Sequence, residues 1–374
     1  MSRNATKDLT TGSPMKLILG FGIPLLFGML FQQFYNMMDT IIVGKFLGVS
    51  ALASVGATGS INFMIIGFCM GVCNGFAIPV AQRFGAKDEH GMRKFVANSV
   101  WLSIIFAVVM AVLVCVFCRQ ILELMNTPED IFDGSYSYIF VIFLGIPATY
   151  MYNLLSGIMR SLGDSKTPLY LLIFSSILNI ILDLLSIIVL KMGVAGAAWA
   201  TVIAQAVSGF CCLGVIWKKF PILHVQREEW QPDKFCILNL CNMGIPMGLQ
   251  YSITAIGSVI IQAAVNSLGS VAVASVAAAV KINMFLCCPY DAMGSTMATY
   301  AGQNVGAGKF DRLKQGEKSC TLLGLVYGIA AFIFILLFGK YLALLFVDAS
   351  EEVIINQAHL FLMCNSAFYF PLAL

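Results

Sequence analysis

The chain has 374 residues, of which 59% are hydrophobic and only 11% are charged, and its formal net charge is +3. A soluble chain carries about 25% charged residues, so this composition excludes an ordinary soluble domain and is typical of a protein that crosses the membrane many times. The small net charge does not suggest a nucleic-acid partner. The 12 cysteines lie mostly inside apolar runs, which predicts free, packed thiols rather than a disulfide framework or a zinc site.

Ten apolar runs are long enough to cross a lipid bilayer, at about 20 residues each. Only helices and closed barrels satisfy their backbone groups in lipid, and these runs are too long and too uniformly apolar for barrel strands. We therefore predict an all-α polytopic membrane protein. The predicted spans are 15–42, 52–82, 95–118, 134–158, 168–190, 194–217, 236–265, 271–301, 319–339 and 353–374.

The distribution of Lys and Arg predicts the orientation. With the N-terminus in the cytoplasm, the segments on that side carry 17 of the 22 Lys and Arg residues, those on the other side carry four, and Lys281 lies inside a span. Cytoplasmic loops are enriched in such residues. The first span is longer than a signal-peptide core and has no small-residue cleavage site. We expect an uncleaved, multi-pass protein of the inner or plasma membrane.

The chain contains an internal repeat. The tripeptide Gly-Ile-Pro at 22–24 returns at 244–246, and the segment 81–86 returns as 302–307, at an offset of about 221 residues. Six spans separate the copies, so both enter the membrane in the same direction, a layout known from secondary transporters. We predict two parallel-repeat six-helix bundles: an N-terminal lobe at 1–217, a cytoplasmic linker at 218–235 and a C-terminal lobe at 236–374. The second lobe is expected to be incomplete, with about four of its six helices, as in a fragment of a protein with about twelve spans.

Polar residues recur on one face of the first span. Gln32, Asn36 and Asp39 are spaced i, i+4 and i+7, which places them on one stripe of a helix. A carboxylate in mid-membrane costs about 2.5–3.5 kcal/mol on insertion scales. The stripe should therefore face a polar cavity rather than lipid.

A second acidic stripe lies on the fifth span, where Asn179 and Asp183 are spaced i, i+4. Thr201 and Gln205 repeat this spacing on the sixth span. Two carboxylates close together resist double ionisation, so such a pair can exchange a proton for a cation. The structural alternative is a hydrogen-bond network that only ties helices together.

Three further residues within spans have open roles. Lys281 is expected either to meet a carboxylate of another helix or to line the cavity, and Asp291 follows a proline at a predicted kink. Both are equally compatible with a structural role. Pro24 precedes Asp39 on the same helix and is a candidate hinge, with a static kink as the alternative.

Several functions lack the residues they need. The segment Gly306-Ala307-Gly308-Lys309 fails as a phosphate loop, because Phe310 stands where Ser or Thr is required. Without a nucleotide-binding domain, transport has to be driven by an ion gradient. The histidines are isolated, so neither a catalytic metal site nor an enzyme is expected, and no cofactor is needed besides the coupling ion.

Several motifs together resemble the multidrug and toxic compound extrusion (MATE) transporters. They are FQQFYNMMDTIIVGKFLG, the LASVG segment at 52–56, PVAQRFGAKD, MRSLGDSKTP, the N-x-x-x-D of the fifth span, AWATVIAQ at 198–205 and GQNVGAGKFDRLKQG. The likeness covers the whole chain.

The resemblance implies twelve helices in two bundles around a central cavity, and export of cationic or amphipathic organic compounds coupled to inward H+ or Na+. The DinF-like branch carries an acidic network that maps onto Asp39, Asn179, Asp183 and Thr201, which would bind the proton or Na+. The NorM-like branch carries carboxylates in its seventh and tenth spans, and the corresponding predicted spans of this chain have none. Candidate cavity residues are Gln32, Gln33, Tyr35, Asn36, Gln205, Gln250, Lys281 and Asp291. We expect a monomer in the bilayer.

Three alternatives remain open from the sequence. A lipid-linked saccharide flippase of the same wider superfamily would need a more basic cavity, and Lys281 is the single basic residue found within a span. A membrane-embedded enzyme would need clustered catalytic side chains, and a channel would not need acids in one lobe alone. Transport of a labelled drug against an imposed ion gradient separates them.

Overall fold

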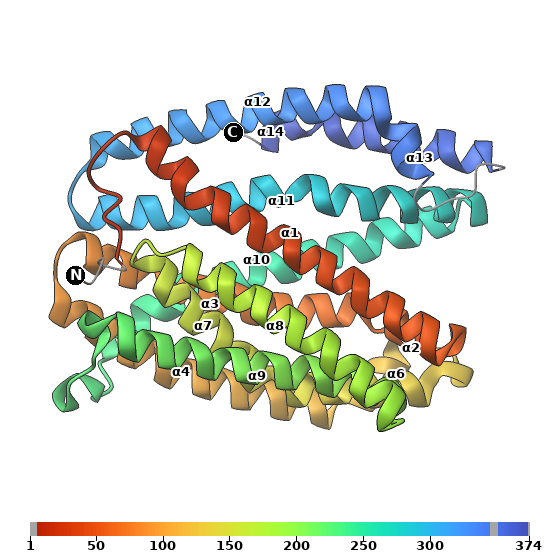
Figure 1. Cartoon of the computed structure of the whole chain (residues 1–374), viewed down its shortest axis with the longest axis horizontal. Coiled ribbons are helices and arrows are strands. Elements are labelled where there is room, and N and C mark those ends of the chain that lie inside the picture. Colours follow the sequence, from red (N-terminus) through yellow and green to blue (C-terminus); the bar gives the residue numbers. More distant parts are fainter. Residues whose placement is uncertain (1–5, 345–350, 373–374) are drawn as a thin grey trace.

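The fold was analysed in a computed structural model, which describes residues 6–344 and 351–372. Every regular element among these residues is a helix, so the predicted all-α class is confirmed (Figure 1). The helices of the first half are α1 Pro14–Leu47, α2 Val49–Ala57, α3 Gly59–Gly85, α4 Glu89–Val116, α5 Cys118–Leu124, α6 Glu129–Leu144, α7 Ile146–Ser161, α8 Lys166–Leu184 and α9 Gly193–Lys219. Those of the second half are α10 Lys234–Asn266, α11 Ser270–Gly306, α12 Phe310–Ala343, α13 Glu352–Ala367 and α14 Tyr369–Leu372.

The helices match the predicted spans closely, with three differences. The predicted span 52–82 is divided at Thr58 into the nine-residue α2 and the long α3. Within the described residues eight helices are long and apolar enough to cross a membrane, and the pair α6 and α7 makes a ninth span if counted together. This pair is bent by 46°, at Gly145 and with Pro147 in the first turn of α7. A proline is tolerated at that position because its missing N–H is not needed there. The tenth predicted run forms the 16-residue α13 and the short α14, which do not reach the length of a span.

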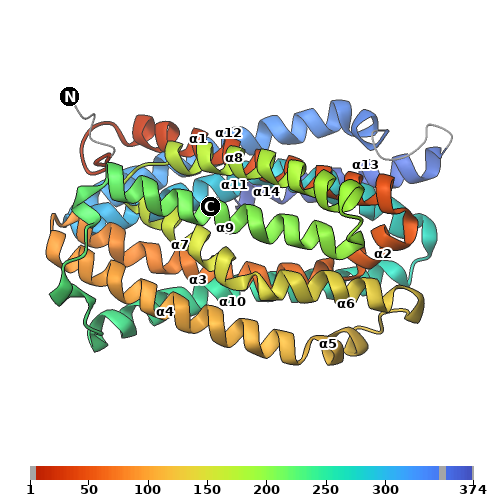
Figure 2. The same cartoon turned by 60° about the horizontal axis from the view of Figure 1, so that its bottom comes forward.

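Most of the loops that the structure describes lie at the two ends of an elongated helix bundle (Figures 1 and 2). The end at the left of Figure 1 holds segments 6–13, 86–88, 162–165, 220–233 and 307–309, and we call it the basic end because the Lys- and Arg-rich segments lie there. The opposite end holds the turns after α1, α5 and α10. Helices that cross between the ends build the wall of the molecule.

The first helix of each repeat packs against the other repeat. Helix α1 contacts α11, and its Gly22 would place a Cβ 3.0 Å from the Thr296 hydroxyl. Helix α10 contacts α3 in the same way: a Cβ on Gly75 would lie 2.5 Å from the Cα of Gly244. Gly71 and Gly75 on α3 face Gly244 and Gly248 on α10, so two small-xxx-small patterns bring the helix backbones together. The two copies of the sequence repeat are thus packed reciprocally, because the first helix of each copy contacts a helix of the other.

At the basic end the backbones of the two repeats approach each other even more closely. A Cβ on Gly85 of α3 would lie 1.9 Å from the carbonyl oxygen of Gln303 on α11, and a Cβ on Gly306 would lie 1.7 Å from that of Gln82. We call these four residues the glycine contact. They occupy matching places in segments 81–86 and 302–307, the two repeat copies. Only glycine lets both backbones approach this closely, so the two halves are in direct contact at the basic end.

The segment before α1, which we call the strap (residues 7–12), crosses this contact. Its Lys7 N–H donates to the Leu162 carbonyl after α7, at 2.8 Å. Its Leu9 N–H donates to Oε1 of Gln303 on α11, also at 2.8 Å, and the Gln303 amide in turn donates to the Ser161 carbonyl. Leu9 is buried. The strap is therefore bonded to both halves of the chain at the basic end.

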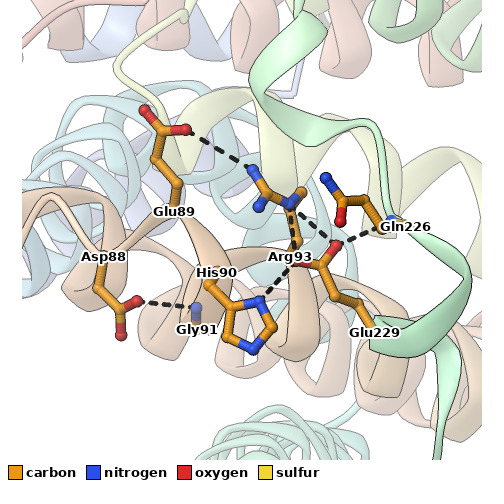
Figure 3. A network of polar contacts seen from close by, with 7 residues as sticks. All are labelled: Asp88, Glu89, His90, Gly91, Arg93, Gln226 and Glu229. Carbon is orange, nitrogen blue, oxygen red and sulfur yellow. Dashed lines mark hydrogen bonds and ion pairs between the residues drawn. The ribbon is translucent and has the colours of Figure 1, made fainter.

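The linker between the repeats is folded, with 3₁₀ turns at Pro221–Leu223 and Arg227–Trp230. Its Glu229, 1% exposed, accepts hydrogen bonds at 2.9 Å from Nε of Arg93 and pairs with Nδ1 of His90 at 2.8 Å (Figure 3). Burial raises the pKa of Glu229, but the bonds from the Gln226 N–H, Arg93 and His90 outweigh it, so the pKa lies below its ordinary value of 4.5. The linker is thus fastened to the start of α4.

Candidate functional site

Residues of the predicted polar stripes line a chamber that is formed mainly by the first half of the chain. This chamber has a volume of about 180 Å³ and lies between α1, α3, α7, α8, α9, α10 and α11. Among its lining residues are Gln32 and Tyr35 of α1, Asn179 of α8, and Thr201 and Gln205 of α9. The structure therefore brings residues more than 160 positions apart in sequence to one cavity.

The two predicted acids meet beside this chamber. Asp39 is 9% exposed and Asp183 is fully buried, and their carboxyl groups lie within interaction range of each other. Helices α1 and α8 pack together, which brings Asp39 and Asp183 near each other. The sequence spacing predicted a shared acidic site, and the geometry has the proximity that such a site requires.

A hydroxyl group connects the polar neighbours of the acids. Oγ1 of Thr201 lies 3.2 Å from the Tyr35 hydroxyl and accepts a hydrogen bond from Nδ2 of Asn179 at 3.2 Å. The same Thr201 hydroxyl donates to the carbonyl of Ala197, one helical turn earlier in α9. With its own proton used in that bond, the hydroxyl offers its lone pairs to the two neighbours. Helices α1, α8 and α9 are linked through this one oxygen.

Several buried oxygens of the site have no hydrogen-bond donor among the described residues. They are Oδ1 of Asp39, Oδ1 of Asn179 and both carboxylate oxygens of Asp183. Unpartnered buried oxygens are costly, because burial removes the water that would otherwise satisfy them. Carboxylate, amide and hydroxyl oxygens are the ligands that a hard monovalent cation takes, and a carboxylate also accepts a proton. The donor set at this site fits either ion.

The end of α8 has an unusual local form next to the acid. After Leu184 the helix continues as a π-helical turn at Leu185–Val189, and the Ser186 hydroxyl donates to the Asp183 carbonyl at 3.2 Å. Single π turns inside helices often occur at functional sites because they rotate the side chains before and after them. Here the turn begins two residues after Asp183, which is fully buried.

A second, larger cavity of about 720 Å³ lies between the two halves of the chain. Four residues line both cavities and form the neck between them: Asn74 of α3, Arg160 of α7, Tyr251 of α10 and Ser295 of α11. Gln250 and Asp291 line the second cavity alone. The acidic pair is therefore placed behind an inner chamber that joins an outer, inter-repeat chamber.

The predicted cavity residues divide into three groups. Gln32, Tyr35 and Gln205 line the inner chamber, where the Thr149 hydroxyl donates to Gln205 at 2.6 Å. Pro24, the candidate hinge, also lines it and is buried inside α1. Gln250 and Asp291 line the outer chamber. The remaining three residues line neither of these two cavities: Gln33 is half-buried, and Asn36 and Lys281 are exposed. The exposed position of Asn36 means that the polar stripe of α1 is narrower than its i, i+4, i+7 spacing predicted.

Sequence reasoning missed two residues of this region. Tyr138 of α6 is buried within electrostatic range of Asp39, Asp183 and Tyr35. Its signal was a polar aromatic ring within an apolar span. Arg160 was counted among the charges of the cytoplasmic loops, but it belongs to the last turn of α7 and lines both chambers. The bend between α6 and α7, which sequence spacing does not specify, brings α7 to this place.

Comparison with known proteins gives consistent matches. A probable multidrug resistance protein of Bacillus subtilis strain 168, YoeA, is 31% identical over 353 residues, which cover 92% of this chain and 75% of that protein. YpnP, a second probable multidrug resistance protein of the same strain, is 28% identical and covers 97% of this chain and 81% of its own length. A solved structure described as the outward-facing conformation of a multidrug resistance MATE family transporter superposes with a TM-score of 0.89 at 25% identity, covering 97% of this chain and 80% of that one.

The sequence profile of the MatE family matches residues 24–185 and 246–374, one stretch in each repeat. These two stretches hold both acids, the lining of the outer chamber and that of the inner chamber except Thr201, Ala204 and Gln205 of α9. The resemblance found in the sequence is therefore confirmed. The chain belongs to the MatE family of transporters.

Proposed function

We propose that this chain exports cationic or amphipathic organic compounds from the cell and exchanges them for H+ or Na+ by alternating access. The observation that carries the proposal is the buried pair Asp39 and Asp183 beside a chamber, whose carboxyl groups lie within interaction range of each other and keep oxygens without a hydrogen-bond donor. A membrane transporter without a nucleotide-binding domain needs a site that binds the driving ion, and this pair has the chemistry to do so.

The coupling follows from charge. Two ionised carboxylates in contact, away from water, repel each other strongly. Binding of a proton to either carboxyl, or of Na+ between Asp39, Asp183 and the oxygens of Asn179 and Thr201, relieves that repulsion. The empty and the ion-loaded forms of the first lobe therefore differ in energy. An ion that prefers one conformation and a substrate that prefers the other are coupled without touching each other.

The substrate would occupy the chambers that open toward this pair. The inner chamber offers Gln32, Tyr35 and Gln205 to polar groups, and Met29 and Met70 add adaptable apolar surface. Such a mixture of a few polar groups with deformable side chains suits ligands of varied shape. This is the physical basis we propose for accepting many compounds.

We further propose that the basic end faces the cytoplasm, in keeping with the excess of Lys and Arg in its segments. The glycine contact and the strap then close the cytoplasmic side in this conformation. The likeness to a structure described as outward-facing supports the same assignment. Separation of α3 from α11 at the glycine contact would open this cytoplasmic side, and the alternation of the two forms completes the cycle.

The test is gradient-driven transport by the purified chain in liposomes. A fluorescent organic cation is added, a pH gradient or a Na+ gradient is imposed separately, and the initial rate of movement is compared with that of liposomes without a gradient. We expect one of the two gradients to drive transport. Asp39→Asn and Asp183→Asn should each abolish the driven part, because the amide neither accepts a proton nor offers a charge to Na+.

Asp133→Asn is the matched control, because Asp133 is an exposed carboxylate of α6, the fifth residue of that helix. It should transport at the rate of the unchanged chain. Driven transport at that same rate in both Asp39→Asn and Asp183→Asn would refute the role of the pair. Equal loss in the Asp133 control would mean that the assay reports folding rather than coupling.

A further inference from the structure

Arg160 is a cation held in the neck between the two chambers. It stands in the last turn of α7, is half-buried, and lines both cavities. One amino group of its guanidinium donates to Oδ1 of Asn74 on α3, at 3.0 Å. A guanidinium carries five N–H donors in a planar fork, so most of its donor capacity is left for other partners.

No described carboxylate forms an ion pair with Arg160, because the ion pairs of residues 6–344 and 351–372 all involve other residues. A charged side chain inside the membrane is costly unless a counter-charge or water offsets it. The acids Asp39 and Asp183 do not serve it, since they lie beside the far part of the inner chamber. The neck therefore offers an unpaired guanidinium to whatever enters.

The surroundings of Arg160 suit a ligand with an aromatic part. Tyr152 of α7 lines the inner chamber beside it, and Tyr251 of α10 lines both chambers. Asp291 of α11 lines the outer chamber with Arg160, so that cavity presents one guanidinium and one carboxyl group from opposite halves of the chain. A carboxylate or phosphate group is the partner that a guanidinium fork recognises best.

We propose that Arg160 is an anion-recognition residue, which binds the carboxylate or phosphate group of amphoteric aromatic compounds in the outer chamber, with their cationic end toward Asp291. The proposal rests on the exporter function proposed above and names a substrate class for it. The acidic pair drives the cycle, whereas Arg160 selects the cargo. The chambers would thus accept compounds that carry an acidic group, in addition to plain cations.

The test measures the binding of two dyes to the purified full chain by fluorescence anisotropy. One is a rhodamine with a free carboxylate, which is a zwitterion at neutral pH, and the other is its methyl ester, which is a cation of nearly the same size. The readout is the ratio of their dissociation constants. We expect the unchanged chain to bind the free acid at least as tightly as the ester. Arg160→Gln should shift the ratio about tenfold toward the ester, since a charge-assisted bond is lost.

Arg160→Lys and Arg119→Gln are the matched variants. Lysine keeps the charge but not the planar fork, so its ratio should lie between those of the unchanged chain and Arg160→Gln, and this ordering would not arise from a purely structural role. Arg119 is an exposed residue of α5 and should leave the ratio unchanged. If Arg160→Gln fails to fold, the shift in Arg160→Lys decides.

An unchanged ratio in both Arg160 variants, or failure of the unchanged chain to bind the free acid, would overturn the proposal. Gradient-driven uptake of the ester into liposomes reports separately on export. A chain that transports the ester but shows no Arg160-dependent ratio would keep the exporter function and lose the anion site. A chain that shows the ratio but no driven uptake would lose the exporter function instead.

Discussion

Replacing Gly85 by alanine should weaken the closed state of the basic end. A Cβ at this position would lie 1.9 Å from the carbonyl oxygen of Gln303, whereas ordinary van der Waals contact begins at 3.4 Å. The helices α3 and α11 would therefore have to move apart by about 1.5 Å, the difference between these two distances. Gln303 cannot easily give way, because hydrogen bonds to Leu9 and Ser161 hold its side chain.

Overpacking of this kind costs about 1–3 kcal/mol. The penalty falls on the closed form alone, because the two helices no longer touch here once the end has opened. The ratio of closed to open molecules should then fall by about 5- to 150-fold. The higher helix propensity of alanine acts in both forms and does not change this ratio. Gly306→Ala should give the same result, since its Cβ would lie 1.7 Å from the Gln82 carbonyl oxygen.

The opening can be measured as a distance distribution between two spin labels. Exposed Glu89 at the start of α4 and exposed Lys314 in α12 place one label on each half at the basic end. Labels attached through noncanonical amino acids avoid the 12 native cysteines. We expect one short distance for the unchanged chain and a second, longer distance in Gly85→Ala.

Gly257→Ala is the control, because a Cβ at Gly257 of α10 would meet no atom within 4 Å. Its distance distribution should match that of the unchanged chain. If Gly85→Ala and Gly306→Ala also match it, with the same unfolding temperature, then the glycine contact does not determine the closed state and the reasoning fails.

Three further predictions concern the basic end. Arg93→Met removes the main partner of Glu229, which is 1% exposed. This variant should lower the free energy of unfolding by about 3 kcal/mol in a denaturant titration. For comparison, loss of the exposed ion pair of Arg119 and Glu123 should cost less than about 1 kcal/mol in the same titration. Because its folded-state pKa is lowered, Glu229 contributes stability that is complete above about pH 4.5 and is lost as the pH falls through the folded-state value. Unfolding curves of the unchanged chain and Glu229→Gln should therefore converge on acidification; a constant difference would contradict this. Leu9→Asp places a charge in a buried position of the strap and should lengthen the spin-label distance as Gly85→Ala does, whereas an unchanged distance would show that the strap does not hold this end.

The spans and the two acids could be predicted from sequence because membranes impose strong rules on both. Apolar length marks a span, and a carboxylate such as Asp39 or Asp183 is too costly to keep in lipid without shelter. The helix boundaries came within a few residues for most spans, since polar, charged or glycine residues separate the apolar runs. The family resemblance, rather than residue spacing, grouped Thr201 with Asn179, and a hydrogen bond joins these two side chains in the structure.

The features that were missed depend on packing between distant segments. The sequence assigns Arg160 to a charged loop. In the structure the bend at Gly145 places α7, and Arg160 with it, beside the chambers. Asn36 lies only about 60° around α1 from Asp39, at 100° per residue, yet this rotation is enough to expose it. The hydrogen bonds of the strap and of Glu229 join residues over 130 positions apart, and no local pattern encodes them.

The two repeat copies make equivalent contacts with each other, but the acidic pair Asp39 and Asp183 lies in the first copy alone. In the second copy the position that matches Asp39 falls at Ile260 or Ile261, so the ion exchange that we propose would belong to one lobe. Exchange of a monovalent cation for a single H+ or Na+ then moves no net charge across the membrane, whereas exchange of a zwitterion moves one positive charge inward. The membrane potential would accelerate the second exchange and leave the first unaffected. The dependence of the exchange rate on the membrane potential is then set by the charge of the transported compound and not by the protein.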